Sequence, residues 1–415
     1  MSSISGKKRS IATLLALLIL FPGIALAREV KRDPDTGRIR VLYIGAPFNT
    51  YCAYTVYQND PLLLNTPVSG MAWLEPTVIK RALRLYMPRT RREYSDYDVV
   101  GFDDATYEHF SPNTLIWMRD SLLEDGVGFF MGGGSGSFGG WANYLDWGRT
   151  PLQDVMPVEC TPDRVEFSVN RVIRFDDDFI RSVPWDEFEN HNIFGMYNVV
   201  ELKQGAVQLS ELSPVGGGRT DPGWSWWDVG EGRFFASPTG FRGTLAGGTT
   251  SAGVSFIHWR YYPDFVSNMA YFTAGFTPPS DPQLLHTTRQ KFREVDYHRQ
   301  MVIGTMEFVS RFGASMSKID EKLAEVEKSL ARAKLSFIGL ELEESMDELE
   351  HILSLLSEAD ALAVKAKETA LYWLYVVEWL VVTATLLACG SILWSLMVRR
   401  RLYSQVHSTR IGFSE

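Results

Sequence analysis

The sequence contains only three cysteines, so a dense disulfide framework cannot hold the fold together. Cys52 and Cys160 could pair with each other, whereas Cys389 lies in an apolar run. There is no N-x-S/T sequon, and no Gly-Lys-Ser/Thr that would mark a P-loop. Basic residues are not in excess either. The net charge of -9 and pI of about 5.4 argue against a nucleic-acid binder, which would have a basic face.

What the chain does have first is a short apolar segment at its start. Lys7, Lys8 and Arg9 precede an apolar run at 11–24, and a small-x-small pattern follows at 25–27. This order is typical of a secretory signal peptide, and the run is short for a membrane span. We therefore predict a cleaved signal peptide at residues 1–27.

A second apolar run, at residues 371–398, is long enough to cross a bilayer. Arg399, Arg400 and Arg401 follow it directly, and basic residues of this kind mark the cytoplasmic side. Glu378 is placed at the outer interface if the span begins at Trp379. The sequence thus predicts a single-pass protein of the cell membrane with an extracytoplasmic N-terminal domain and a cytoplasmic tail at 399–415.

Between these two segments, the first half of the chain has an alternating pattern. Buried strands are expected at 40–44, 98–102 and 126–131, with helices at 76–86 and 112–124. Ser111 is a good N-cap for the second of these helices. Strands that alternate with helices predict an α/β fold with a parallel sheet covered on both faces.

Strands and turns dominate residues 161–276. Gly230-Glu231-Gly232 separates two apolar strands and predicts a hairpin. The proline-rich stretch 278–282 indicates the end of the domain, and a linker with a first helix is expected over 277–314.

Residues 315–369 carry two apolar seams with alternating spacings of three and four. Such seams are typical of a coiled coil or of an antiparallel helix pair. Gly339 lies between them and could be a bend or a turn. The sequence therefore predicts a helical stalk and leaves open whether it is one long helix or a hairpin.

The strongest local motif is the glycine-rich turn, which we define as residues 132–140, directly after the third strand. Glycines at this edge of a parallel sheet can bring backbone N–H groups close to a ligand. Ser135 and Ser137 each match the G-x-S-x-G nucleophile elbow only in part. A tight structural turn is the alternative interpretation.

These motifs together resemble the class I glutamine amidotransferase-like superfamily. The resemblance covers about residues 39–276 and rests on these segments: Asp98-Val99-Val100-Gly101-Phe102-Asp103-Asp104, residues 125–133, 137–141 and 150–158, Gly230-Glu231-Gly232-Arg233, and a closing helix within 259–276. It implies a flavodoxin-like three-layer sandwich. From the position of the glycine-rich turn at the sheet edge, we expect Gly132, Gly133, Gly134, Gly136, Asp103 and Asp104 to form the ligand-binding edge.

The departure from the family pattern concerns the nucleophile. Working members carry an elbow cysteine with a histidine base, because glutamine's amide is a poor electrophile. Here the turn holds Ser135 and Ser137 and no cysteine. A serine would need a histidine within hydrogen-bond reach, and His258, after an apolar strand, is the best placed.

Two further features have ordinary explanations. The acidic residues Asp176, Asp177 and Asp178 lack EF-hand spacing, so a solvated loop is expected and no metal or cofactor is predicted. Trp224, Trp226 and Trp227 could stack a sugar or anchor a partner, but alternation across an amphipathic hairpin with one face in the core is the preferred explanation.

The leading expectation is a non-catalytic domain that binds a partner or small ligand at the glycine-rich edge, with a stalk that positions or multimerises it. One alternative is an envelope hydrolase that uses Ser135 or Ser137 with His258. The other is a structural protein whose working part is the stalk. The expected partners are the bilayer and a protein partner or a second copy bound through the stalk, but not nucleic acid.

Overall fold

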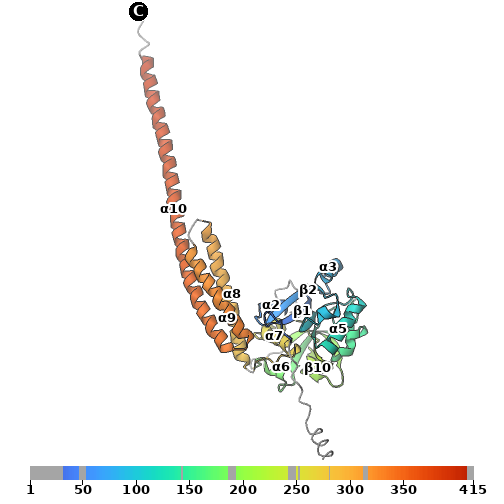
Figure 1. The fold of residues 1–415 in the computed structure, drawn as a ribbon. Helices are drawn as coiled ribbons and strands as arrows, with labels where there is room; N and C mark the ends of the chain where they lie inside the picture. Colours follow the sequence, from blue (N-terminus) through green and yellow to red (C-terminus); the bar gives the residue numbers. More distant parts are fainter. Residues whose placement is uncertain are drawn as a thin grey trace, which may run out of the picture. The chain divides into compact units, whose positions relative to one another are not determined.

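The computed structural model describes residues 31–45, 53–141, 144–185, 193–241, 249–250, 253–279, 281–311 and 316–408. The chain forms two compact units, a head (Met1–His286) and a helical unit (Thr287–Glu415), which are considered separately below (Figure 1). The predicted signal peptide, Cys52 and His191 lie outside the described residues.

The main sheet of the head has the strand order β2-β1-β3-β4-β11-β10-β7. Its first five strands in this order are parallel, and β10 and β7 extend it by antiparallel pairing. The bounds are β1 Ile39–Gly45, β2 Leu63–Ser69, β3 Val99–Asp103, β4 Gly128–Gly132, β7 Val207–Gln208, β10 Ser225–Val229 and β11 Gly232–Ser237. The fold is therefore α/β with a mainly parallel sheet.

Helices cover both faces of this sheet. One face packs against α3 (Pro76–Tyr86) and α5 (Pro112–Asp125), with the short α4 (Arg91–Tyr94) beside α5. The other face packs against α2 (Ala53–Asn59) and α7 (Tyr262–Thr273). Alternate residues of each strand point to opposite faces, and because both faces are covered, every residue of β3 and β4 is buried.

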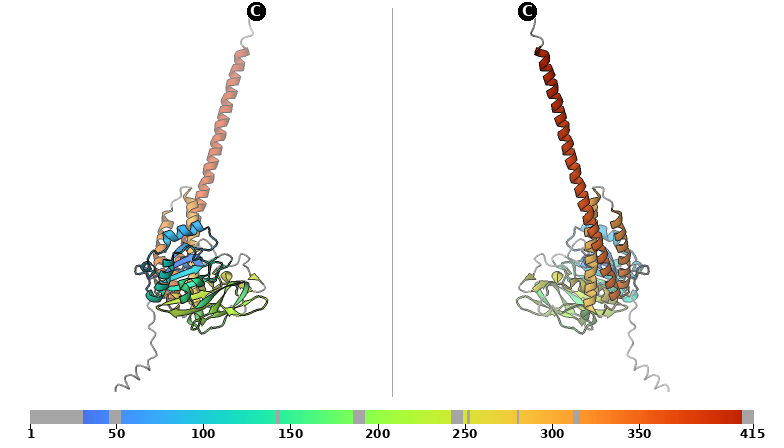
Figure 2. Two further views of the ribbon diagram at one scale, coloured as in Figure 1. Left: turned by 90° about the vertical axis from the view of Figure 1, so that its right-hand side faces the viewer. Right: turned by 90° about the vertical axis from the view of Figure 1, so that its left-hand side faces the viewer.

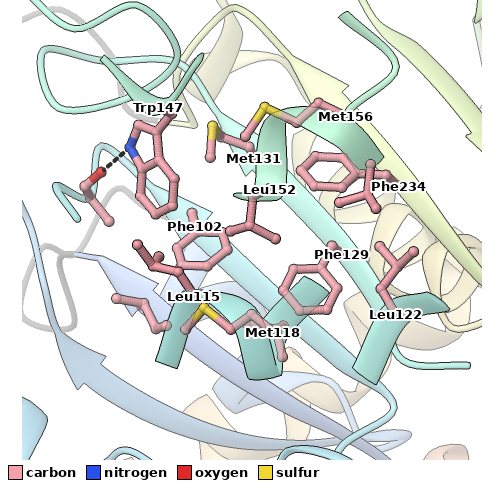
Figure 3. Close-up of a cluster of buried hydrophobic side chains, with 14 of the residues drawn as sticks. Phe102, Leu115, Met118, Leu122, Phe129, Met131, Trp147, Leu152, Met156 and Phe234 are labelled. Atoms are coloured by element: carbon pink, nitrogen blue, oxygen red, sulfur yellow. Dashed lines mark hydrogen bonds between the residues drawn. The ribbon is translucent and has the colours of Figure 1, made fainter. Parts of the chain in front are cut away.

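The core under α5 is built from large apolar side chains (Figure 3). Phe102 of β3 and Phe129 of β4 meet Leu115, Met118 and Leu122 of α5 there. The 3-10 turns η1 (Trp147–Arg149) and η2 (Pro151–Val155) close the end of this cluster. They follow the glycine-rich turn, so that turn lies at the rim of a packed core.

A second sheet of the head has the order β12-β13-β6-β5-β8-β9. Its long strand β5 pairs antiparallel with β6 and shifts register between Cys160 and Arg164 and again between Val165 and Ser168. The remaining bounds are β5 Val158–Val172, α6 Asp178–Arg181, β6 Ile193–Leu202, β8 Ser210–Pro214, β9 Asp221–Pro222, β12 Thr249–Thr250, β13 Gly253–Ser255 and η3 Phe256–His258.

Several local predictions are confirmed. The strands predicted at 40–44, 98–102 and 126–131 correspond to β1, β3 and β4, and the Gly230–Gly232 hairpin joins β10 to β11 with Gly230 at φ 59°. The hydroxyl of Ser111 accepts a hydrogen bond from the Thr114 N–H at 3.1 Å and caps α5 as expected. Strand β2, which contains Pro67, was not predicted. It pairs through β1 alone, and a proline is tolerated in such an edge strand.

The helical unit consists of most of α8 (Pro282–Ser310), α9 (Ser317–Ile338) and α10 (Leu342–Ser408), which lie side by side over the length of α9 in both views (Figures 1 and 2). The chain reverses at Gly339–Glu341, where Leu340 has φ 66°. The stalk is thus an antiparallel hairpin. Its two seams bury each other, and the Lys322–Glu358 and Arg332–Glu348 ion pairs flank them.

Helix α10 continues far beyond the hairpin. Its 67 residues span about 100 Å. Within the described residues it is one helix long and apolar enough to cross a membrane, and none of its most apolar window is buried. The apolar run at 371–398 therefore lies in a helix that is compatible with a single membrane span.

Candidate functional site

The carboxyl ends of β1, β3, β4 and β11 meet at one edge of the main sheet. The glycine-rich turn follows β4 at this edge, and Asp103 and Asp104 end and follow β3. In open α/β sheets this is the edge at which ligands bind. The geometry of the turn decides which of its groups a ligand could reach.

Three backbone N–H groups in the first part of the turn already have acceptors inside the protein. Gly133 donates to the carbonyl oxygen of Ser237 at 2.8 Å, and Gly134 donates to Oδ1 of Asn198 at 2.8 Å. Gly136 donates to Oδ1 of Asp104, also at 2.8 Å. The three nitrogens that a ligand would need are therefore engaged in the fold.

Close packing of backbone explains why these positions are glycine. A Cβ atom on Gly133 would lie 1.8 Å from the carbonyl oxygen of Pro238, and one on Gly139 would lie 1.7 Å from that of Thr161. No side chain can be accommodated at such distances without moving the backbone. The glycines let the main sheet and the second sheet approach each other through this turn.

Asn198 of β6 binds the turn to the second sheet. Besides accepting from Gly134, its side-chain amide donates to the carbonyl oxygens of Gly134 at 3.1 Å and of Ser137 at 3.3 Å. A buried amide with three partners in one turn fixes the conformation of that turn. Sequence analysis missed the role of Asn198, because this residue lies far along the chain from the turn and in a different sheet.

The two serines lie within the same closed turn. Ser137 is 0% exposed and Ser135 is 5% exposed. The Ser137 hydroxyl has no hydrogen-bond partner among the described residues. His258 is at the end of η3, but the described part of the chain does not include its side chain. Among the described histidines, His286 is bound to Asp264, with 2.6 Å between Nδ1 and Oδ2.

Asp103 and Asp104 are fully buried. The Tyr43 hydroxyl donates to Oδ2 of Asp103 at 2.6 Å. Asp104 has a left-handed backbone with φ 51°, which brings its carboxylate over Gly134 and onto the Gly136 N–H. Gly132 is the last residue of β4 and pairs with Asp103 and Ser237. The expected ligand-binding residues are thus brought together, mainly by contacts with one another.

Cys160 lies on β5 rather than in the turn, and its thiol is free. Its sulfur lies 3.9 Å from the sulfur of Met156. Burial raises the pKa of this thiol well above the usual range, so it stays protonated and unreactive.

An exposed group of aromatic residues lies directly on the turn. We define the aromatic surface as Trp73, Trp141, Tyr144 and Arg164. Trp73 is 57% exposed and Trp141 is 39% exposed, with 6.3 Å between their ring centroids. The Tyr144 ring lies 5.9 Å from that of Trp73, and burial raises the pKa of its hydroxyl.

The backbone of the turn supports this surface. Ala72, which precedes Trp73, contacts Gly136, and its carbonyl oxygen accepts from the Tyr144 hydroxyl at 2.7 Å. The Trp141 N–H donates to the carbonyl oxygen of Ser135 at 2.9 Å. The only sequence signal for this surface was that Trp141 directly follows the glycine-rich turn. Trp73 had no such signal, because it comes after β2, which was not predicted.

The remaining sequence candidates have structural roles. Asp177 caps α6 and accepts from Nε1 of Trp226, and Trp224 is buried. No group of three or more metal-ligating side chains occurs in the part of the chain that the structure describes. A cleft of about 800 Å³ at the opposite end of β4 and β11 includes Arg233, which is paired with Asp228.

Comparison with known proteins leaves the family open. No family model matches the chain, and no curated protein matches it. Two solved structures from Salmonella typhimurium are similar to it, the cytoplasmic proteins STM3548 (18% identity, TM-score 0.43) and STM1381 (17% identity, TM-score 0.44). Each alignment covers 57% of this chain and 99% of the other. A GH42 beta-galactosidase from G. stearothermophilus is similar over 50% of this chain and 28% of its own, at 9% identity and a TM-score of 0.28.

Proposed function

We propose that this is a single-pass membrane protein whose extracytoplasmic head binds a ligand without chemical turnover at the carboxyl edge of its main sheet. The observation that carries the proposal is the closed glycine-rich turn with exposed aromatic side chains beside it. The turn's donors and hydroxyls are inside the fold, so the surface offered to a ligand is the neighbouring one.

The family proposed for the head is the amidotransferase-like one. The order β2-β1-β3-β4-β11 is the 2-1-3-4-5 order of flavodoxin-like sheets, and its switch point lies between β1 and β3. Asp103 and Asp104 follow β3 at that point. The elbow cysteine of working amidotransferases is missing, and burial keeps Cys160 protonated, so the described part of the head offers no thiolate for glutaminase chemistry.

The proposed topology rests on the two ends of the chain. The signal peptide would export the head, α10 would cross the membrane, and Arg399–Arg401 would hold the tail in the cytoplasm. The stalk would position the head rather than join two copies, because the seams of α9 and α10 are buried against each other within one chain.

The test is a comparison of the full chain in detergent with its Ser135→Ala and Ser137→Ala variants. Ester, amide and glycoside substrates are offered to each at equal concentration. We expect no turnover above the no-enzyme rate in any of them, and no labelling of the wild type by a fluorophosphonate probe. Specific turnover that either substitution abolishes would establish a hydrolase and overturn the proposal.

A further inference from the structure

Arg164 differs from the other arginines at the rim of the head. Its guanidinium lies over the Trp141 ring, with 4.1 Å from Cζ to the ring centroid. Its Nε and Nη1 atoms are buried, and neither has a hydrogen-bond partner among the described residues. Arg91 and Arg233, by contrast, are paired with Asp125 and Asp228. A desolvated guanidinium is costly unless an anion pairs with it.

The position of Arg164 relates it to the turn. In the antiparallel pairing of β5 with β6, Arg164 lies opposite Asn198, the residue that binds the glycine-rich turn. Directly opposed residues point to the same face of a sheet. The register shift between Cys160 and Arg164 is a strand irregularity of the kind that re-aims side chains near binding sites.

We propose that the aromatic surface binds an anionic saccharide, whose sugar ring lies on the exposed indole of Trp73 or Trp141 and whose carboxylate or phosphate pairs with Arg164. This inference rests on the proposed binding function and assigns its ligand class. The planar fork of a guanidinium suits a carboxylate or a phosphate group, since it can donate two parallel hydrogen bonds.

The geometry of the rings favours a saccharide over a flat ligand. The planes of Trp73 and Trp141 are tilted by 50° to each other, and Tyr144 meets Trp73 edge-on at 71°. A planar base could stack on one ring only, whereas a puckered sugar offers apolar C–H groups on both of its sides. One face of the Trp141 ring is already covered by Arg164, so the charge and the stacking surface are adjacent.

The experiment is calorimetric titration of the full chain in detergent with three probes. Methyl glucuronide supplies a carboxylate, glucose 6-phosphate supplies a phosphate, and methyl glucoside is the neutral control. We expect at least one anionic probe to bind roughly tenfold or more tighter than the glucoside, which corresponds to one charge-assisted pair. The tighter of the two anions identifies the acidic group.

Matched variants locate the site. Arg164→Gln should weaken binding of the anionic probe about tenfold or more, and Trp73→Ala or Trp141→Ala, whichever removes the ring under the sugar, should weaken binding of every probe. The controls are Arg171→Gln, an exposed arginine on the same strand, and Phe167→Ala, an exposed aromatic residue of β5, and both should bind like the wild type.

Three outcomes would overturn the inference: no binding of any probe at millimolar concentration, equal binding of neutral and anionic probes, or an Arg164→Gln variant that binds normally. If the glucoside binds as well as the anions and Trp73→Ala abolishes this binding, the ligand class is wrong while the proposed binding function stands. Turnover that depends on Ser135 or Ser137 would instead overturn the proposed function itself.

Discussion

The glycine-rich turn and the aromatic surface are neighbours at one edge of a sheet. In each, the observed burial is the opposite of what its residue types suggest. The turn consists mostly of glycine and serine, as an open loop would, yet it is buried, and the N–H groups of Gly134 and Gly136 donate to side chains of the fold. Trp73 and Trp141 are large and apolar, as core residues would be, and they are exposed. The difference shows that close backbone packing can require glycine as strictly as ligand binding can.

Among the substitutions that test this difference, one at Gly133 should have the largest effect on folding. In Gly133→Ala the new Cβ would overlap the Pro238 carbonyl oxygen at 1.8 Å, and neither strand end can retreat without breaking sheet pairing. We expect the head to fail to fold, measured as loss of soluble full chain in detergent. Gly304→Ala is the control, because a Cβ there meets nothing within 4 Å and alanine favours a helix. Normal yield and melting of Gly133→Ala would mean that the turn is open.

The next largest effect separates the buried Trp147 from the exposed Trp73 in their contribution to stability. Trp147 is 0% exposed, and its Nε1 donates to the carbonyl oxygens of Gly136 at 2.7 Å and Ala105 at 3.1 Å. Trp147→Ala should cost about 3–5 kcal/mol in the free energy of unfolding. Trp73→Ala should cost less than about 1 kcal/mol, since more than half of that side chain is already in water. Thermal or denaturant unfolding of both variants checks this, and equal losses would show that Trp73 is a core residue.

The smallest effects on the free energy of unfolding are expected for substitutions of Arg91 and Arg164. Arg91 donates to both carboxylate oxygens of Asp125, at 2.8 Å from Nε and 2.9 Å from Nη2, and Arg91→Gln should cost about 1 kcal/mol. Arg164→Gln should not lower stability, because it removes a guanidinium without a partner among the described residues. A loss of 1 kcal/mol or more at Arg164 would show that its charge is compensated in the free protein.

Arg91 and Arg164 should also differ in how their substitution changes the pH dependence of stability. The hydrogen bond from Arg91 holds the pKa of Asp125 below its ordinary value of 3.8, so the unfolded state binds the proton more readily than the folded one. The stabilisation is therefore present above the ordinary pKa and is lost as pH falls through the lower folded pKa. Arg91→Gln should flatten the loss of stability below about pH 4. Arg164→Gln should leave that acid limb unchanged, and denaturant unfolding between pH 3 and 7 would show either result.

The sequence predicted β1, β3 and β4 of the parallel sheet because each has a largely apolar run that ends in glycine or an acidic residue. Ser111 marked the start of α5 by a capping rule that depends on neighbouring residues alone. Strand β2 was missed because Pro67 reads as a turn signal, and only its edge position in the sheet makes proline acceptable. The stalk seams were identified, whereas the turn at Gly339 depends on packing that periodicity does not encode.

The candidate site was less accessible to sequence reasoning. Asp103, Asp104, Ser135 and Ser137 were correctly placed at one edge, because strand ends in a parallel sheet meet there. Whether that edge is open depends on Asn198 and Pro238, which come from distant strands and have no local signature. Arg164 was overlooked for the same reason, since its position over Trp141 follows from strand pairing.

The most direct test of the central claim is hydrogen exchange of the glycine-rich turn in the full chain. If the turn is closed, we expect the amides of Gly133, Gly134 and Gly136 to exchange as slowly as those of β4, because each donates to an internal acceptor. Asn198→Ala should speed exchange at Gly134 without unfolding the sheet. Exchange of these amides within seconds in the wild type would show an open, ligand-ready turn and contradict the account.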